Sequence, residues 1–427
     1  MRAVARPVRV ASLVLVSGIA LAAVGTGGVL AATRVQAQIP ALTPEVVSTA
    51  SLAAGPNTSV PIDPPQQGSL VLAAVFDKSV TQLVSADAQT VRPIASVAKT
   101  MTALAILDAH PLPADQAGPS LTVTQQDVSD YVSIRASDGS FAPVTLGERL
   151  SERDLLIGLM LPSANNFALT AARWIDGSVA AFVQRLNRRA VALGMLHTHF
   201  ADPDGLDVRT ASTAADLVLL GEQVVVNDAL LSIVSTSSAR LPDGTPVQNL
   251  NILLGEEPGW VGVKTGWTPN AGGCLLFAAK RTLVAGAPPL IMVGAVLDQA
   301  PNGNVDLVNP ELGGAFDVAR TTVDNAYKDF TTVHLGPGTI PVRGRVSGPW
   351  GGYSSLQLAG PDRYLLLRSG DTLSMATSAT PITVPAAAGT RAGSVTVSLK
   401  GALVGTWTLA TVSAVRGPSP WWKLLSG

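Results

Sequence analysis

The sequence predicts an α/β fold followed by a small all-β domain, and three observations support this. Two short apolar runs near residue 70 read as strands and precede a long helical block. Strand-like runs return from about residue 260 and end in one helix, a pattern typical of a sheet flanked by helices with a helical subdomain. After residue 330, short alternating runs separated by Gly, Pro and Ser indicate a separate C-terminal β-rich domain.

The first 37 residues predict an export segment. Arg2, Arg6 and Arg9 form a basic start, and an apolar run without a charged residue follows over 11–32. The segment Val35-Gln36-Ala37 would suit signal cleavage, but the run is also long enough to span a bilayer. A cleaved signal peptide and a retained N-terminal membrane anchor over 1–37 both remain open. Either one places the bulk of the protein outside the cytoplasm.

Residues 38–68 contain six prolines with Ser, Thr and Gly, which predicts a flexible linker. Ordered structure is expected from Ser69. The expected strands and helices of a first domain over 69–330 are strands at 70–76 and 80–86, a helix from about Ala95, helices at 121–131, 148–160, 167–175, 178–193 and 213–226, strands at 260–264, 274–280 and 290–297, and a closing helix at 317–330.

The predicted β-rich domain covers residues 331–427, with strands at 364–368, 394–399 and 406–412. Its tail, from Pro420 to Leu425, holds two tryptophans and a lysine. Such a tail can anchor a protein at a membrane interface. We expect instead that the tryptophans pack against their own sheet.

Composition excludes several function classes. Charged residues make up 14% of the chain, the net charge is −1, and Lys and Arg do not cluster, so nucleic acid is not an expected partner. One cysteine excludes an internal disulfide bond. His197 and His199 lack an evident third ligand, and the aspartates at 202, 204 and 207 are better explained by turn chemistry. We therefore expect no metal and no cofactor.

The start of the predicted helix at Ala95 combines a hydroxyl with an amine. Ser96 and Lys99 are three residues apart, which places them on one face of a helix. The following run from Val97 to Leu107 is apolar on nearly every side, which predicts a buried helix. Burial disfavours the charged form of a lysine, and a neutral amine beside a hydroxyl is a base beside a nucleophile. Alone, so short and frequent a pair is better explained by a helix cap and a lysine that reaches solvent.

Two further short signals follow in order along the chain. Ser163-Ala164-Asn165 lies in a turn between two predicted helices, and Lys264-Thr265-Gly266 ends a predicted strand. Each signal is weak alone. The three signals in this order, with Ser96 opening a buried helix, form a specific pattern.

At these residues the chain resembles the serine DD-peptidases, the low-molecular-weight penicillin-binding proteins that include the D-alanyl-D-alanine carboxypeptidases. The resemblance covers roughly residues 69–330 and includes the loop and helix from Leu193 to Leu217 and the stretch from Lys264 to Phe277. It implies the fold of that family, a DD-peptidase/β-lactamase-like antiparallel sheet with flanking helices.

The resemblance also implies a role for each motif residue. Ser96 would attack the carbonyl of the penultimate D-alanine, Lys99 would accept its proton, and Ser163 would relay a proton to the leaving D-alanine. The substrate-binding residues would be Asn165 for a peptide amide, Lys264 for positive potential, Thr265 and Thr268 for the terminal carboxylate, and Gly266 and Trp267 beside them. The N–H groups of Ser96 and Trp267 would form the oxyanion hole.

The chain departs from the family pattern at two places. Ala164 stands where relatives often have glycine. Some relatives carry an arginine after the strand that corresponds to 290–297, where this chain has Asp298. Carboxylate binding would then depend more on the threonines.

The function that the resemblance implies is an exported serine DD-carboxypeptidase. Its partners would be peptidoglycan stem peptides ending in D-Ala-D-Ala, with β-lactams as covalent inhibitors. The alternatives are a β-lactamase, which would need an activated-water loop that the sequence lacks, and a β-lactam-binding or cell-wall scaffolding protein with little peptidase activity.

Overall fold

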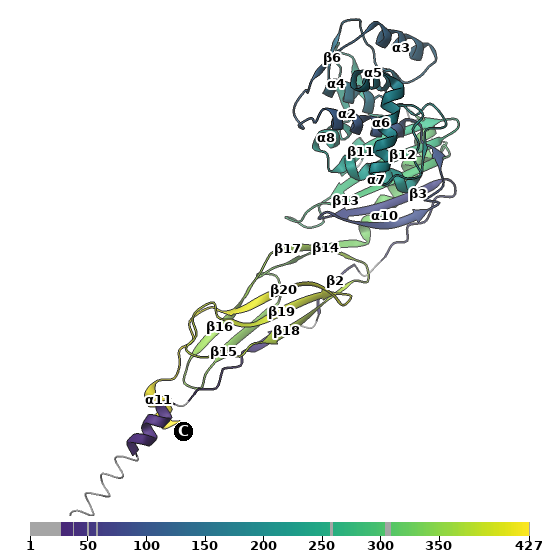
Figure 1. The fold of residues 1–427 in the computed structure, drawn as a ribbon. Coiled ribbons are helices and arrows are strands. Elements are labelled where there is room, and N and C mark those ends of the chain that lie inside the picture. Colours follow the sequence, from purple (N-terminus) through teal and green to yellow (C-terminus); the bar gives the residue numbers. More distant parts are fainter. Residues whose placement is uncertain are drawn as a thin grey trace, which may run out of the picture. The chain divides into compact units, whose positions relative to one another are not determined.

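The computed structural model describes residues 27–36, 38–48, 51–56, 59–256, 259–303 and 309–426. The chain divides into two compact units. We call residues 58–332 the catalytic unit, and residues 1–57 together with 333–427 the β-unit. Figure 1 shows the elements of both units.

A five-stranded antiparallel sheet forms the base of the catalytic unit, in the order β11-β12-β13-β3-β4. Its strands are β3 (Ser69–Phe76), β4 (Ser79–Ala86), β11 (Trp260–Thr268), β12 (Gly272–Arg281) and β13 (Leu290–Gln299). The order brings the hairpin at the start of the unit beside strands from its end, since β3 pairs with β13. β11 lies at one end of this order, so one of its edges faces no other strand of the sheet.

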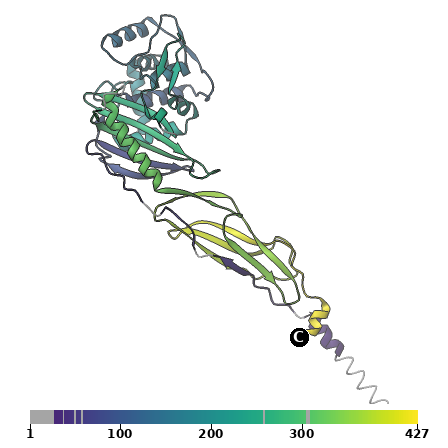
Figure 2. The same ribbon diagram turned by 180° about the vertical axis from the view of Figure 1, so that it is seen from behind.

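Helices cover both faces of this sheet (Figures 1 and 2). Cys274, Leu276 and Ala278 face a core that α7 (Ala214–Val225) shares with the helical subdomain. Because side chains alternate along a strand, the residues between them face the other side. There α10 (Gly313–Lys328) packs on β12 and β13, and the Tyr327 hydroxyl donates to the carbonyl of Ala279 at 2.8 Å.

The helical subdomain supplies the remaining elements of the catalytic unit. Its helices are η1 (Ala95–Ala98), α2 (Lys99–Ala109), α3 (Gln125–Ala136), α4 (Glu152–Met160), α5 (Asn165–Asp176), α6 (Val179–Ala192), α8 (Asp228–Val234) and α9 (Leu253–Glu256). Short strand pairs join them: β5 (Arg92–Pro93) with β8 (Ala211–Ser212), β6 (Ser120–Thr122) with β7 (Arg149–Ser151), and β9 (Ser238–Arg240) with β10 (Pro246–Gln248). α2 is buried from Lys99 to Leu107, as its apolar sequence predicts.

One predicted helix start is wrong, and one predicted cap is confirmed. The helix predicted at 121–131 begins only at Gln125, whereas the helix of the segment 148–160 begins at Glu152, directly after Ser151, the residue whose type suits the cap. In each case a threonine or serine at the N-cap forms a capping box, and the residues before it pair as β6 and β7. The apolar residues Leu121 and Leu150 are cross-strand partners, not parts of a helical face.

The β-unit contains a seven-stranded sheet in the order β1-β15-β16-β20-β19-β18-β2. Its strands are β1 (Glu45–Ser48), β2 (Ser51–Ala54), β15 (Val342–Ser347), β16 (Tyr353–Ala359), β18 (Thr372–Ala379), β19 (Arg391–Leu399) and β20 (Ala402–Thr411). β14 (Phe330–Leu335) pairs with β17 (Arg363–Arg368). Trp407, Leu373 and Val397 lie in the core.

The predicted linker over 38–68 is wrong for residues 45–48 and 51–54. These residues form β1 and β2, which pair with β15 and β18 and occupy the two ends of the strand order. The six prolines that suggested a linker all lie outside these two strands. Proline cannot donate to a sheet, so its absence from 45–54 is what permits the pairing.

The tail differs in part from the expectation. Residues 420–425 form the short helix α11 (Pro420–Leu425). Trp422 contacts Trp350 of its own unit edge to face, with ring centroids 5.4 Å apart, whereas Trp421 is 74% exposed. Only one of the two tryptophans therefore packs as predicted.

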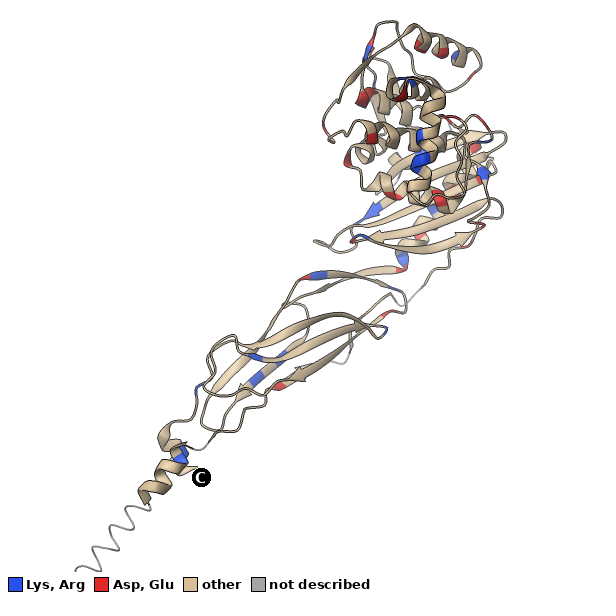
Figure 3. Cartoon of the chain, in the orientation of Figure 1, with Lys and Arg blue, Asp and Glu red and all other residues tan. Residues whose placement is uncertain are grey.

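Most of the predicted export segment lies outside the described residues, except 27–36, which are helical. In the described part of the chain, no single helix has the length and hydropathy to cross a bilayer. The helices α7 and α8 meet that test only as a pair, across a bend of 105°. Lys and Arg are interspersed with Asp and Glu over the catalytic unit (Figure 3).

Candidate active site

The nucleophile and base predicted from the sequence meet at the start of the buried helix. Ser96 lies in η1 and is partly exposed, whereas Lys99 is the first residue of α2 and is completely buried. The Lys99 Nζ lies 2.8 Å from the Ser96 Oγ. A hydroxyl this close to an amine can transfer its proton directly.

Two carbonyl oxygens hold the Lys99 amine in place. Its Nζ donates to the side-chain oxygen of Asn165 at 2.7 Å and to the backbone oxygen of Asp204 at 2.9 Å. These two bonds use two N–H groups of a neutral amine, so its lone pair is directed at Ser96. Burial lowers the pKa of Lys99 to about 8, against the opposite influence of Asp204 and Asp202. The site thus increases the share of the neutral amine that the sequence predicted, relative to an exposed lysine.

The loop that supplies the Asp204 carbonyl was not predicted as part of the site. Asp202 accepts hydrogen bonds from the backbone of Gly205 and Asp207 and from the Thr210 hydroxyl. Gly205 has φ of +82°, and a Cβ there would lie 1.8 Å from the backbone oxygen of Ala95. The Asp-Pro-Asp-Gly sequence predicts this turn, but it does not predict that the turn packs beside Ser96.

The second motif reaches the same point from the junction of α4 and α5. Ser163 has φ of +66° and is buried, and its Oγ has no hydrogen-bond partner among the described residues. Asn165 is the first residue of α5, and its backbone N–H donates to the oxygen of Ser140 at 2.8 Å. The uncommon backbone conformation at Ser163 places its hydroxyl at the site. No hydrogen bond from the described residues uses this hydroxyl, so it is free for chemistry.

The third motif lies on β11, alongside η1. Lys264 is buried, and burial together with the Lys99 charge holds its pKa well below the ordinary value. A Cβ on Gly266 would lie only 2.9 to 3.0 Å from the Ile94 oxygen and from the backbone nitrogens of Ser96 and Val97. Glycine at this position therefore lets the strand approach the nucleophile.

Each of the three motifs contributes to the lining of one cleft of about 120 Å³, whereas Lys99, Asn165 and Lys264 are buried beside it and are not lining residues. Its lining residues are Ser96, Ser140, Ser163, Leu250, Thr265, Gly266, Trp267, Asn309, Glu311 and Leu312. Because β11 lies at the end of the sheet, the backbone beside Trp267 can pair with an extended peptide in this cleft. The N–H of Ser96 and an N–H of that free edge are the candidates for the oxyanion donors that the resemblance implies.

Sequence reasoning missed five of the cleft residues: Ser140, Leu250, Asn309, Glu311 and Leu312. They come from loops and from η2 (Pro310–Leu312), and none belongs to a recognisable motif. Thr268, in contrast, is not among the lining residues. Its Oγ1 accepts the N–H of Ala271 at 3.1 Å and closes the turn after β11.

The end of β13, where some relatives carry an arginine, holds an ion-pair network. Asp298 pairs with Arg92, which also pairs with Asp87 at 2.7 Å. Arg92 reaches this place from β5, just before the nucleophile. Its charge is shared by two carboxylates, and it does not line the cleft.

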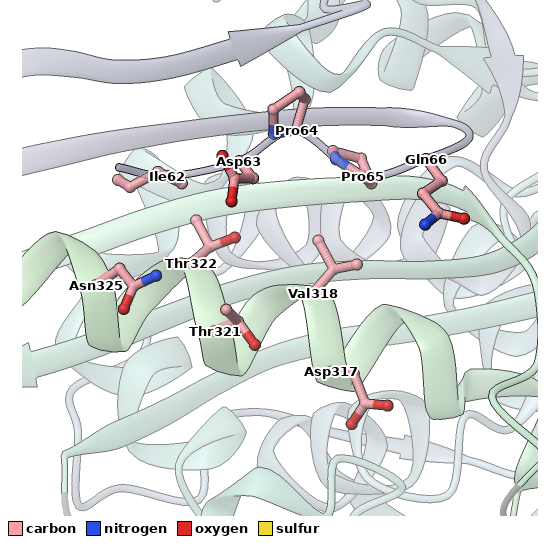
Figure 4. Close-up of a pocket in the computed structure, with 10 residues that line it drawn as sticks. All are labelled: Ile62, Asp63, Pro64, Pro65, Gln66, Asp317, Val318, Thr321, Thr322 and Asn325. Carbon is pink, nitrogen blue, oxygen red and sulfur yellow. The ribbon is translucent and has the colours of Figure 1, made fainter. Parts of the chain in front are cut away.

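A larger pocket, of about 290 Å³, lies between the segment 62–66 and α10 (Figure 4). None of its lining residues belongs to the three motifs. Among the described residues, no group of three or more His, Cys, Asp or Glu is placed to hold a metal ion.

Comparisons with known proteins agree with this geometry. A family model described as D-alanyl-D-alanine carboxypeptidase, peptidase family S11, matches residues 69–294. The chain is 34% identical to a D-alanyl-D-alanine endopeptidase of Escherichia coli (strain K12), over 48% of this chain and 63% of the relative. It is 33% identical to a D-alanyl-D-alanine carboxypeptidase of Streptomyces sp. (strain K15), over 47% of this chain and 72% of the relative.

A solved structure extends this likeness to the fold. The crystal structure of the Streptomyces K15 DD-transpeptidase matches with a TM-score of 0.51 and 27% identity, covering 62% of this chain and 99% of that chain. The predicted fold class and the predicted enzyme class, a serine-type D-Ala-D-Ala carboxypeptidase, are confirmed. The matched residues include all three motifs, and the chain belongs to the D-alanyl-D-alanine carboxypeptidase family of serine peptidases.

Proposed function

We propose that this protein is an exported DD-carboxypeptidase that removes the terminal D-alanine from peptidoglycan stem peptides and is inhibited by β-lactams. The observation that carries this proposal is the Lys99 amine, 2.8 Å from the Ser96 hydroxyl and held by Asn165 and the Asp204 carbonyl. The family membership supports DD-peptidase chemistry in general.

In the first half of the reaction, the Ser96 Oγ attacks the carbonyl carbon of the penultimate D-alanine while its proton passes to Lys99. The N–H groups at Ser96 and at the free edge of β11 stabilise the oxyanion. The C–N bond then breaks as Ser163 delivers its proton to the leaving amine and receives in turn the proton that Lys99 took from Ser96, which leaves Lys99 neutral for the second half. The products are free D-alanine and an ester on Ser96.

In the second half, water attacks this ester, Lys99 accepts a proton of the water, and Ser96 leaves with a proton. A β-lactam would form the same ester, but its leaving nitrogen stays attached to the acyl group. Inhibition by β-lactams is therefore expected to be long-lived.

Release of D-alanine from a synthetic peptide ending in D-Ala-D-Ala tests this function. The full chain should release one D-alanine per peptide, and Ser96→Ala should release none. Ser120→Ala, on an exposed serine of β6, is the matched control and should keep full activity. No release by the wild type would overturn the proposal, and covalent labelling by penicillin without release would favour a scaffolding protein. Rapid turnover of penicillin would favour a β-lactamase.

We also propose that the β-unit attaches the protein to the outer face of the cytoplasmic membrane. The basic start and apolar run over 1–32 supply an export segment. The helix at 27–36 and α11 contact each other, because Lys423 Nζ donates to the Val35 oxygen at 2.8 Å. Trp421 and Leu425 of α11 are 74% and 83% exposed, a pattern suited to a lipid interface.

Fractionation of cells tests this attachment. The variant Trp421→Ser with Leu425→Ser should release more protein from membranes washed with salt. Leu403→Ser, which changes a residue that is 67% exposed on β20, should not. Quantitative recovery of the wild type in the soluble fraction would contradict the proposal.

A further inference from the structure

A second pocket of the catalytic unit lies outside the cleft of the three motifs. It has a volume of about 190 Å³. Its lining residues are Leu121, Thr122, Thr124, Asp127, Thr170, Arg173 and Trp174. They come from β6, from the first turn of α3 with its cap, and from the last turns of α5. We call it the Trp174 pocket.

The charges of the Trp174 pocket are already paired. Asp127 is buried and accepts hydrogen bonds from the Thr170 hydroxyl at 2.7 Å and from the Arg173 guanidinium at 2.6 Å. Its other oxygen accepts the hydroxyl and the N–H of Thr124. Arg173 also pairs with Asp130 at 2.6 Å.

This pairing limits which ligands fit. One guanidinium between two carboxylates leaves a net negative charge, which disfavours an anion. Both oxygens of Asp127 are occupied, so a small cation would find no free ligand there. A neutral ligand fits best.

The remaining surface of the pocket is aromatic and hydroxylic. The Trp174 indole is partly exposed and stacks with the His110 ring at a centroid distance of 4.8 Å, which fixes its orientation. Leu121 adds apolar surface, and Thr122 adds an exposed hydroxyl side chain at the rim, whereas the Thr124 hydroxyl already donates to Asp127. A pyranose ring presents the matching surface, with a face of C–H groups and a rim of hydroxyls. A rigid aromatic ring with a few polar groups is a common way to hold such a ligand.

The pocket lies one helix length from the cleft. α5 begins at Asn165, which binds Lys99, and reaches Trp174 about 14 Å further along its axis at 1.5 Å per residue. α3 connects the same two places, since it begins at the pocket and is followed by Ser140 of the cleft. An extended peptide of four residues spans about 14 Å. A stem peptide in the cleft can therefore carry its sugar to the pocket.

We infer that the Trp174 pocket is a saccharide subsite, which holds an amino sugar of the glycan that bears the stem peptide. This inference rests on the proposed function. The glycan-bound substrate would be anchored at two points, the peptide in the cleft and the sugar on Trp174. A stem peptide without its sugar would lose the second contact.

Two substrates with the same pentapeptide test the inference, one bare and one attached to the N-acetylglucosamine–N-acetylmuramic acid disaccharide. The wild type should show a kcat/KM about tenfold higher for the disaccharide form, mainly through KM. In Trp174→Ala this ratio should fall close to one. Tyr353→Ala, which removes an exposed aromatic residue of the β-unit, should keep the wild-type ratio.

A direct binding measurement separates this inference from the proposed function. Saturation-transfer NMR with a neutral disaccharide of N-acetylglucosamine alone, on the Ser96→Ala protein, needs no catalysis and avoids the free carboxylate of N-acetylmuramic acid. Binding that Trp174→Phe retains and Thr122→Ala weakens would support the subsite, and neither variant removes the packing of an aromatic ring on His110. Equal kcat/KM values on both substrates for the wild type, or disaccharide binding that Trp174→Ala leaves unchanged, would overturn it. No D-alanine release from either substrate would instead count against the proposed function, and the binding result would still decide the subsite.

Discussion

Lys99 carries more of the chemistry than any other residue, because its burial determines its protonation. An amine in a dry site resists taking up a proton, and burial lowers the pKa of Lys99 to about 8. The base is therefore protonated and inactive below that pH. Free enzyme at pH 6 would hold only a small neutral fraction.

The first prediction is the pH profile that follows. The kcat/KM for D-alanine release should rise about tenfold per pH unit below pH 8 and level off above it. Stopped-flow acylation by a β-lactam should show the same inflection, since it needs the same base. Lys99→Arg, which is charged at every pH in this range, should show no rising limb. A flat profile between pH 6 and 9 for the wild type would contradict the assignment of the base.

A second buried group should affect stability and not catalysis. Glu152 is fully buried at the start of α4, and neither carboxylate oxygen has a hydrogen-bond partner among the described residues. Burial raises the pKa of Glu152 from 4.5 to about 7. Between about pH 4.5 and pH 7 the folded state then binds more protons than the unfolded state. The free energy of unfolding therefore falls as the pH rises through this range.

We predict that the free energy of unfolding is about 3 kcal/mol lower at pH 8 than at pH 4.5 and that the Glu152 side chain causes this difference. Chemical denaturation should show the wild type losing that free energy of unfolding over this range, while Glu152→Gln loses much less. Asp115→Asn, an exposed change on the neighbouring loop, is the control and should behave like the wild type.

The motif residues were predictable at this scale, and the cleft residues around them were not. Ser96, Lys99, Ser163, Asn165 and Lys264 occur in short patterns whose order is itself a signal. A loop brings Ser140 to the cleft and η2 brings Glu311, and no local sequence pattern predicts that these residues lie together. The backbone carbonyl that holds Lys99 is beyond any prediction from side-chain types, because every residue has one.

At the scale of elements, the contact of β11 with η1 is a tight constraint on the site. β11 and η1 lie so close together that a Cβ added to Gly266 would be 3.0 Å from the backbone nitrogen of Ser96. Gly266→Ala should push β11 away and lower kcat/KM by at least about 100-fold, since misplacement of about 1 Å has that effect. The fold should survive, as circular dichroism would show. Gly255→Ala, in open space on α9, should change nothing.

The helix α3 depends on one buried contact. Asp127 is its only buried residue, and it connects α3 to Thr170 and Arg173 of α5. Asp127→Ala should leave Arg173 without one of its partners and cost about 3 kcal/mol. Hydrogen exchange should rise within α3 and much less within α2. Equal protection of α3 in both proteins would show that Val128 and Tyr131 suffice to hold it.

Elements with strong periodicity were predicted well, and those defined by long-range pairing were not. The burial of α2 follows from its sequence, and the strands of the main sheet differ from prediction by a few residues at their ends. β6 and β7 are three residues each, and their pairing depends on a partner about 30 residues away. A local pattern cannot distinguish such a strand from the first turn of a helix.

At the scale of the whole molecule, residues 45–54 belong to the β-unit although they precede the catalytic unit in the chain. Removing residues 1–56 should therefore expose β15 and β18 at both ends of the sheet order. We expect such a protein to keep penicillin acylation at Ser96 but to aggregate through the β-unit. Light scattering with fluorescent penicillin labelling would measure both. A monomeric, stable β-unit in this variant would show that β1 and β2 are dispensable.

The pairing of β1 with β15 also dictates an order of folding. Glu45 and Arg345 are joined across the strands and are separated by 300 residues along the chain. Closing so long a loop costs more entropy than any contact within the catalytic unit while that unit is unfolded. As the chain emerges during synthesis, β1 and β2 have no partner strands until the entire catalytic unit has been made. We therefore expect the peptidase to fold first and, by shortening the distance between its own ends, to act as the template on which the β-unit closes.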